Sequence, residues 1–451
     1  MIKWLKKVIL KKTVGADDIL KYPQGKRYYQ DFHNIRKSYI DPDAIKVISR
    51  IQSFGYKAYI VGGCVRDLLL GKQPKDYDVV TNAKPNEIRK IFANSRLIGR
   101  RFKIVHIVFR MNKIIEVSTT RSLPDSRNSG KKAEELYLKK DNKFGTFKED
   151  AARRDFTINS LFFDIRSETI IDYTGGVEDL KEKLIRIIGD EDISFPEDPV
   201  RMLRAVKFSA LLGFNLHSNL IRGIKKHKRL ITKTSIARLH EEFNKIFRTG
   251  QSYAIFKDMF EYGIFEAMFP VIAEFAKKTK EGKFSFEESG LGKRLMISDK
   301  MIFEHEDINT NIYYSILIAD VLEDLMSFDP KKENINNLIS ERCKLVEEEL
   351  GLSKKELEKI EKIFSSQRIF AREVKNKSGW VKNFKTKDYF QEAFIFYKIN
   401  ARSRKDDEAV QKALFWEIGM RKKLPNAIRK PMVRKLTDYA SRPRKNVSYN
   451  K

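Results

Sequence analysis

The spacing of apolar and polar residues changes along the chain, from mixed periods to a purely helical one. Tyr59–Val61 is a short apolar run before a glycine pair, and Lys103–Phe109 and Lys113–Ser118 have the composition of paired strands. Apolar residues recur every three to four positions in Asp43–Phe54 and Asn86–Phe92, which is typical of helices. The first part of the chain is therefore predicted to be a mixed α/β head.

From about Asp190 onward the apolar pattern is helical only. Pro199–Leu212, Ile236–Phe247 and Ala254–Phe260 show three-to-four spacing, and similar patterning continues to about Arg421. The prediction is an α+β fold in which a mixed-sheet head is followed by an all-helical neck, body and tail. The expected segments are a basic N-terminal extension, the head, the neck, the body and a basic tail, over residues 1–45, 46–190, 191–275, 276–420 and 421–451.

The chain is strongly basic. Its 451 residues include 90 Lys and Arg against 61 Asp and Glu, which gives a formal net charge of +29. This excess indicates a polyanionic partner, and nucleic acid fits better than a membrane because no uninterrupted apolar run approaches a spanning length. Cys64 and Cys343 lack metal-ligand spacing, which is typical of the reducing cytoplasm. We therefore expect a cytoplasmic protein that binds nucleic acid without stable membrane insertion.

Three segments are expected to lie outside the packed core. Met1–Lys12 alternates bulky apolar residues with lysines and is predicted to be a frayed terminus, or a short amphipathic helix that touches a membrane surface or RNA. Ser122–Lys148 is rich in charge and is predicted to be a mobile loop over the site. Arg421–Lys451 has 11 Lys and Arg against one acid, Asp438, and is expected to be a partly disordered tail that binds phosphates.

The candidate chemistry is concentrated around a glycine pair. Gly62 and Gly63 follow the first predicted strand, and without side chains they allow a phosphate to approach the backbone closely. Arg66 would lie in the first turn of the helix that follows. Asp76 and Asp78 are then spaced like residues on one face of a strand, where two adjacent carboxylates repel each other. A pair of divalent metal ions shared with substrate phosphates would relieve that repulsion.

Gly62-Gly63-Cys64-Val65-Arg66-Asp67 followed by Asp76-Tyr77-Asp78 resembles the opening motif of the class II template-independent nucleotidyltransferases. That family comprises the bacterial poly(A) polymerases and the tRNA CCA-adding enzymes. The resemblance continues in order to about residue 275, and more loosely to about residue 420. It implies a nucleotidyltransferase head, a neck with a nucleotide-recognition motif, and a body that binds RNA.

A further acid and a second motif extend this candidate site. Glu116 lies in the apolar run Ile114–Val117, where it is either a third carboxylate beside the metals or a solvent-facing residue of an edge strand. The stretch from Arg153 to Ser160 resembles the second motif of the family. It supplies planar donors for a triphosphate, an acid that orients an arginine or joins the carboxylates, and an amide that reaches a ribose hydroxyl or a phosphate. These residues are Arg153, Arg154, Asp155 and Asn159.

Glu197–Phe208 is similar to the nucleotide-recognition motif of the family. Asp198 and Arg201 are three residues apart, so on a helix they would share one face. A carboxylate accepts from an exocyclic amine and a guanidinium donates to a ring nitrogen, so this pair could select one base without a template. Arg204 and Lys207 continue the same face and could hold phosphates or the primer. Other family members often have arginine where Lys207 stands.

One segment favours the poly(A) polymerase branch. Leu97–Ile107 has two basic residues after a glycine and a later histidine, and it resembles the segment of bacterial poly(A) polymerases rather than that of CCA-adding enzymes. The prediction is an enzyme that adds AMP from ATP to RNA 3′ ends, of mRNA or tRNA, with a two-metal Mg²⁺ site on Asp76, Asp78 and Glu116, and with Asp155 as a further catalytic residue. The alternatives are a CCA-adding nucleotidyltransferase, and an RNA-binding protein with an inactive head.

Overall fold

The computed structural model describes residues 16–99, 103–123, 143–278, 284–326, 334–372 and 379–421. The chain forms two compact units, Met1–Glu274 and Phe275–Lys451. Met1–Lys12, most of Ser122–Lys148, and the basic tail beyond Arg421 lie outside the described residues. The predictions for those segments therefore stay predictions.

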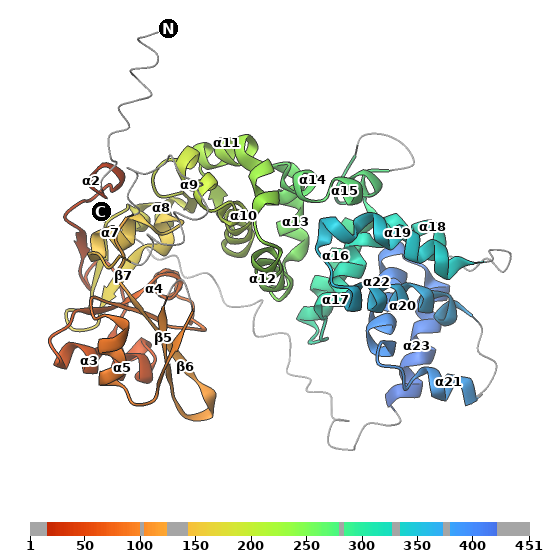
Figure 1. Ribbon diagram of the computed structural model, residues 1–451, viewed down its shortest axis with the longest axis horizontal. Coiled ribbons are helices and arrows are strands. Elements are labelled where there is room, and N and C mark those ends of the chain that lie inside the picture. Colours follow the sequence, from red (N-terminus) through yellow and green to blue (C-terminus); the bar gives the residue numbers. More distant parts are fainter. Residues whose placement is uncertain are drawn as a thin grey trace, which may run out of the picture. The chain divides into compact units, whose positions relative to one another are not determined.

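An eight-stranded mixed sheet forms the centre of the first unit (Figure 1). The strand order is β1-β8-β7-β2-β3-β6-β5-β4; β3 and β6 are parallel, and every other neighbouring pair is antiparallel. The predicted pairing of the strands around Met111-Asn112 is confirmed, since β5 and β6 pair on either side of that turn. The strands are β1 (Lys26–Tyr28), β2 (Ala58–Val61), β3 (Asp78–Thr81), β4 (Ser95–Ile98), β5 (Ile104–Val108), β6 (Ile114–Thr119), β7 (Leu161–Asp164) and β8 (Thr169–Asp172).

The helices of this unit begin and end at recognisable signals. In α3 (Pro42–Ser53), the Asp41 side chain accepts from Asp43 N and Ala44 N, and a proline occupies the first turn. This helix packs against β2, β3 and β6, whereas α5 (Pro85–Ile91) packs against β4 and β5. The other helices before the neck are α2 (Ala16–Ile19), α4 (Gly63–Leu69), α7 (Phe147–Ala152) and α8 (Gly176–Glu182).

Two predictions about the head differ from the structure. The segment assigned to an N-terminal extension supplies β1, which pairs with β8, and its Tyr28 side chain is buried. Tyr22, Lys26 and Tyr28 all donate to Glu178 Oε1, at 2.7, 3.1 and 2.8 Å. The predicted metal-binding strand is shorter than expected, because β3 begins at Asp78. Asp76 therefore precedes the strand and does not share a strand face with Asp78.

The helical neck follows the head. A two-stranded parallel sheet of β9 (Leu184–Ile185) and β10 (Asn215–Leu216) pairs the end of the head with a segment of the neck. The three neck helices predicted from apolar spacing are confirmed as α10 (Val200–Leu212), α12 (Ile236–Phe247) and α13 (Ser252–Glu261). The neck contains α9 (Glu191–Glu197), α10 (Val200–Leu212), α11 (Ser218–His227), α12 (Ile236–Phe247), α13 (Ser252–Glu261) and α14 (Ile264–Met268), and α15 (Pro270–Ala276) crosses the boundary between the units.

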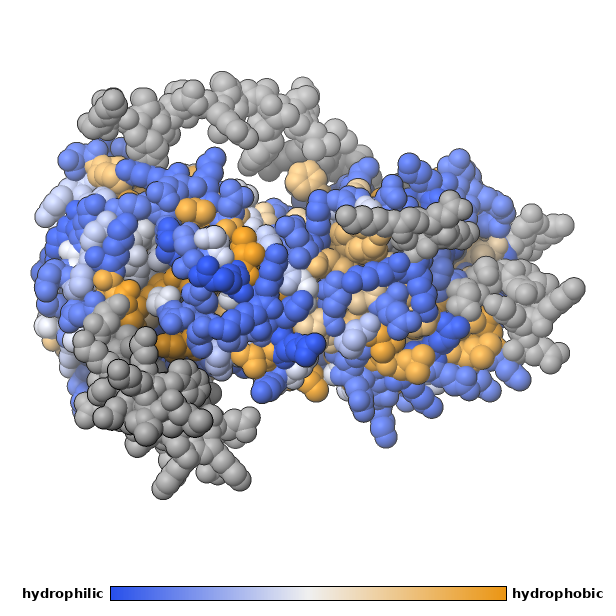
Figure 2. Space-filling view, turned by 90° about the horizontal axis from the view of Figure 1, so that it is seen from above, coloured by the Kyte–Doolittle hydropathy of each residue, from blue (hydrophilic) through white to orange (hydrophobic). Residues whose placement is uncertain are grey.

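The second unit is helical throughout its described residues. Its central helix is α22 (Phe390–Arg404), which is buried along most of its length and packs against α16, α17, α20 and α23. None of the described helices is both long enough and apolar enough to cross a membrane, and hydrophilic residues predominate on the face drawn in Figure 2. The remaining helices are α16 (Gly290–Phe303), α17 (Thr310–Ile318), α18 (Glu323–Met326), α19 (Ile335–Leu350), α20 (Lys354–Ala371), α21 (Gly379–Phe384) and α23 (Asp407–Arg421).

Candidate active site

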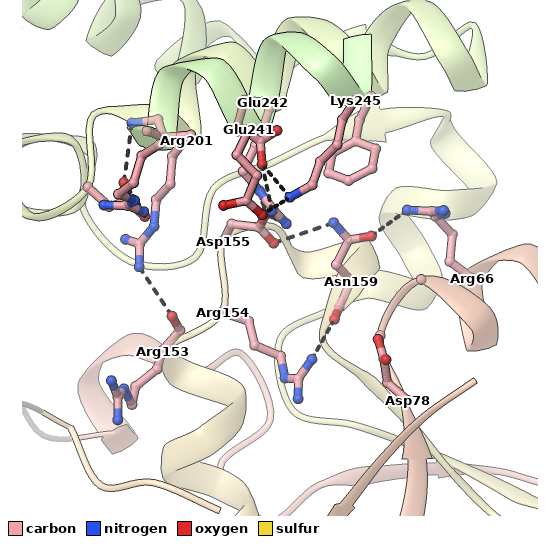
Figure 3. Close-up of a pocket in the computed structure, with 17 residues that line it drawn as sticks. Arg66, Asp78, Arg153, Arg154, Asp155, Asn159, Arg201, Glu241, Glu242 and Lys245 are labelled. Carbon is pink, nitrogen blue, oxygen red and sulfur yellow. Dashed lines mark hydrogen bonds and ion pairs between the residues drawn. The ribbon is translucent and has the colours of Figure 1, made fainter. Parts of the chain in front are cut away.

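A pocket of about 530 Å³ lies in the first unit, between the sheet end that carries Asp78 and the neck helices α10 and α12 (Figure 3). Seven of its lining residues are basic and five are acidic, so basic groups exceed acidic ones, as expected for a site that receives an anion. The lining residues are Gly62, Gly63, Arg66, Asp78, Arg153, Arg154, Asp155, Asn159, Asp198, Val200, Arg201, Arg204, Phe208, Arg238, Glu241, Glu242 and Lys245.

The glycine turn forms one wall of the pocket. Gly62 has a φ of +87°, a conformation that residues with a side chain rarely adopt. A Cβ atom at Gly62 would lie 3.4 Å from Arg154 Nη1 and 3.9 Å from Asp78 Oδ2. Glycine is therefore favoured here by the backbone conformation, whereas the two side-chain atoms would lie at ordinary van der Waals distance from a Cβ atom.

Two of the three predicted metal-binding acids are neighbours in the sheet. Asp78 in β3 lies directly opposite Glu116 in β6, so both side chains are on the same face. Solvent reaches part of Asp78. The atoms packed around its carboxylate and the nearby Glu116 nevertheless raise the pKa of Asp78 to about 6. Asp76 adds to this rise, and Arg154 opposes it. Glu116 is half-exposed. It does not belong to an edge strand, because β6 lies between β3 and β5.

These acids suit a magnesium ion in kind and number. Among the described residues, no three His, Cys, Asp or Glu side chains are grouped closely enough to hold a metal by themselves. Mg²⁺ is usually bound by only one or two carboxylates, with substrate phosphates and water completing the shell. Burial of the Asp78 carboxylate, and the neighbouring Glu116 after it, raise the pKa of Asp78, so a cation held between the two acids would stabilise their charged forms. The Asp78–Glu116 pair therefore fits such an ion. Of the three predicted acids, Asp78 lines the pocket, Glu116 lies opposite it in the sheet, and Asp76 does not line the pocket.

A chain of hydrogen bonds connects several of the residues that line the pocket (Figure 3). Arg66 Nη1 donates to Asn159 Oδ1 at 2.6 Å, and its Nε and Nη2 donate to Asp67 Oδ1. Asn159 Nδ2 donates to Asp155 Oδ1 at 3.4 Å, and Arg204 Nε donates to Asp155 Oδ2 at 2.7 Å. The chain connects α4 of the head to α10 of the neck. It fixes the orientation of Arg66 and Asn159, both of which the sequence predicted to bind nucleotide.

Asp155 performs one of its two predicted roles in this structure. Burial opposes its ionisation, but the neighbouring Arg204 guanidinium and the Phe156 backbone N–H hold the pKa of Asp155 below its usual range. Its carboxylate therefore stays charged and orients Arg204. It is not part of the pair formed by Asp78 and Glu116.

The two predicted triphosphate ligands extend from the end of α7. Arg154 donates to Asp150 Oδ2 at 3.0 Å through Nη2, and to Asn159 O at 3.4 Å through Nη1. Arg153 Nη1 donates to Ser122 O at 3.0 Å. Both guanidinium groups belong to residues that line the pocket, with Arg154 beside the glycine turn.

Asp198 and Arg201 both line the pocket, but they do not share a helical face. Asp198 precedes α10 in an extended conformation, and its Oδ1 accepts from Val200 N at 3.3 Å, near the start of the helix. Arg201 donates to Ser194 and, through Nη2, to Arg153 O at 3.2 Å. The two side chains therefore reach the same pocket from a loop and from a helix.

Lys207 does not line the pocket, contrary to its predicted contact with nucleotide or primer. Its side chain is buried, and Nζ donates to Glu242 Oε2 at 2.7 Å. Burial lowers the pKa of Lys207, although Glu242 opposes that change. The ammonium group is directed to α12, so the geometry favours a structural role for Lys207.

The contribution of α12 to the pocket could not be predicted from the sequence motifs. Arg238 of this helix donates to both carboxylate oxygens of Asp198, at 3.0 and 2.9 Å. Glu241, Glu242 and Lys245 also line the pocket. Their spacing of three and four residues indicates one polar helical face, but only the packing of α12 against α10 shows what that face contacts.

Comparison with known proteins agrees with this geometry. Residues 58–186 match the family described as "Poly A polymerase head domain", and residues 213–275 match "Probable RNA and SrmB- binding site of polymerase A". Poly(A) polymerase I of Haemophilus influenzae is 36% identical over 326 residues, 70% of this chain and 71% of that protein. Poly(A) polymerase I of Escherichia coli O157:H7 is 42% identical over 274 residues, but the match spans only 59% of that protein's length.

More distant relatives include enzymes of the other branch. The CCA-adding enzyme of Lactobacillus helveticus is 36% identical over 218 residues, 48% of this chain and 53% of that enzyme. The crystal structure of Bacillus stearothermophilus CCA-adding enzyme in complex with CTP has a TM-score of 0.58 at 21% identity, covering 84% of this chain and 83% of that one, which shows a shared fold. The chain belongs to the nucleotidyltransferase family that contains the bacterial poly(A) polymerases and the CCA-adding enzymes.

Proposed function

We propose that this chain is a template-independent polymerase that adds AMP from ATP to the 3′ ends of RNA. The observation that carries the proposal is the pocket, where Asp78, the glycine turn, several arginines and the Asp198–Arg201 pair surround one volume. Phosphoryl transfer depends mainly on positioning and on neutralising charge, and these residues supply both. The relatives described as poly(A) polymerase I match more of the chain than the CCA-adding enzyme does, which supports adenylate addition.

Each group in the pocket has a distinct task in this proposal. Arg153 and Arg154 bind the triphosphate, and the glycine turn lets the phosphates approach the backbone. Asn159 contacts the ribose or a phosphate from a side chain that Arg66 and Asp155 hold in place. Arg204, which Asp155 orients, places positive charge where the triphosphate lies.

A divalent ion is part of the proposed chemistry. Asp78 and Glu116 would hold Mg²⁺ together with the phosphates, and Asp76 lies near enough to Asp78 to affect its charge. When bound, Mg²⁺ would neutralise phosphate charge and activate the attacking 3′ hydroxyl group.

The choice of base is assigned to Asp198 and Arg201. We expect Asp198→Ala and Arg201→Ala to reduce the preference for ATP over the other nucleotides by about tenfold or more, because good polar contacts to a base edge supply about 1–3 kcal/mol of discrimination. The measurement is kcat/KM for each of the four nucleotides on one RNA primer. Asp192→Ala is a matched control, since Asp192 is an exposed acid of α9 that does not line the pocket. An unchanged preference in both pocket variants would disprove this assignment.

The function itself is tested by offering all four nucleotides with two primers, a tRNA that lacks its CCA end and an unstructured RNA. A poly(A) polymerase extends both primers with runs of A. Addition of C, C and A to the tRNA alone would establish the CCA-adding alternative. Binding of RNA without extension of either primer would establish the inactive RNA-binding protein, an alternative that the intact pocket disfavours.

A further inference from the structure

A row of polar residues crosses four neighbouring strands of the sheet. Asp78 in β3 lies opposite Glu116 in β6, Glu116 lies opposite His106 in β5, and His106 lies opposite Arg96 in β4. Residues that face each other across a sheet point to the same side, so these four side chains lie on one face. The next row, Val79, Val117 and Val105, points to the other face and is fully buried.

His106 contacts the acid beside Asp78 directly. Its Nε2 atom lies 3.3 Å from Glu116 Oε1, and the His106 side chain is 21% exposed, whereas that of Glu116 is 50% exposed. This distance is within the range of an ion pair between an imidazole ring and a carboxylate. The more enclosed histidine therefore anchors one oxygen of a glutamate that is otherwise half in solvent.

This contact opposes two tendencies of Glu116. A free glutamate side chain has several rotamers, and fixing one of them costs conformational entropy. The carboxylate of Asp78 also repels that of Glu116, which favours rotation of the Glu116 side chain away from Asp78. The contact with His106 uses one carboxylate oxygen and leaves a second acceptor on the same group.

We propose that His106 is a positioning residue, which holds the Glu116 carboxylate beside Asp78 so that the two acids bind a divalent cation together. Groups that hydrogen-bond to metal ligands orient them, and removal of such a group typically weakens metal binding or activity by about 10- to 100-fold. The inference rests on the proposed function, because it assigns a partner to one of the acids in the proposed metal site.

The test is Mn²⁺ binding to the full chain in the presence of a non-hydrolysable ATP analogue and without RNA, measured from the electron paramagnetic resonance signal of free Mn²⁺. We expect His106→Ala to raise the Mn²⁺ dissociation constant about tenfold or more. His106→Gln should restore most of the affinity, because the glutamine amide places a donor near the position of Nε2. Melting temperatures establish that each variant is folded.

Two further variants separate positioning from a general effect of charge. Arg96→Gln removes the positive group beside His106 in the same row and should leave Mn²⁺ affinity unchanged. In a Glu116→Gln background, His106→Ala should cause no further loss, because the two residues act through one contact. An unchanged dissociation constant in folded His106→Ala, or an equal loss in Arg96→Gln, would overturn the role of His106 alone. Failure of the wild-type chain to bind Mn²⁺ would reject the proposed metal site, and the role of His106 with it.

Discussion

Asp78→Asn is expected to lower the rate of AMP incorporation by about three orders of magnitude, which corresponds to about 4 kcal/mol of lost transition-state stabilisation. Asp78 lies at the start of β3, opposite Glu116 and beside the glycine turn, and its raised pKa shows that its charge is costly without a bound cation. Asparagine keeps the shape but cannot neutralise a divalent ion. The rate is measured with saturating ATP and a defined RNA primer across a range of Mg²⁺ concentrations.

A matched control makes the loss specific. Asp164 ends β7, and its carboxylate accepts from Arg166 N and Ser167 Oγ, away from the pocket lining. Asp164→Asn makes the same chemical change at a strand end and should keep activity within about twofold, because Asp164 does not line the pocket. Activity in Asp78→Asn within tenfold of wild type would contradict the assignment of Asp78 to metal binding. RNA affinity should be similar in all three proteins.

Elements that depend on their own apolar stripe could be predicted well from the sequence. The spacing in Ile236–Phe247 gives the helix with the bounds that the structure has, because Phe243, Ile246 and Phe247 form one buried face. Strand β1 could not be predicted in this way. It has three residues, only one of which is buried, and it exists because β8 offers an edge to pair with.

The same distinction applies to the site, where some residues could be predicted from local motifs and others depend on packing between distant segments. Motifs identify residues that are near one another in sequence, such as Gly62, Arg66 and Asp78, and the structure brings these three to one pocket. The lining residues of α12 reach the pocket only because two neck helices pack together. Lys207 shows the opposite error, since helical spacing predicted it on the nucleotide face and the buried acid of α12 holds it outside the lining.

That acid, Glu242, should be among the most important polar side chains for stability in the first unit. Its carboxylate accepts from Lys207 at 2.7 Å and from Lys245 at 3.1 Å, and Arg204 lies 3.9 Å away. Glu242 and Lys207 are both buried. We expect Glu242→Ala to reduce the free energy of unfolding by about 3–5 kcal/mol, because it leaves a buried ammonium group without its carboxylate. The measurement is urea-induced unfolding at pH 7.

Two variants and a pH series test whether the loss comes from this ion pair. Glu241→Ala removes the neighbouring, exposed carboxylate and should cost less than about 1 kcal/mol. Lys207→Met combined with Glu242→Leu replaces the pair by apolar groups and should recover much of the stability. Although burial opposes ionisation, Lys207, Arg204 and Lys245 hold the pKa of Glu242 below its usual range. The difference between wild type and Glu242→Ala should therefore be complete above about pH 5 and shrink as the pH falls through the lowered pKa. A difference that stayed constant down to pH 3, or an equal loss in Glu241→Ala, would show that the buried charge of Glu242 does not stabilise the neck.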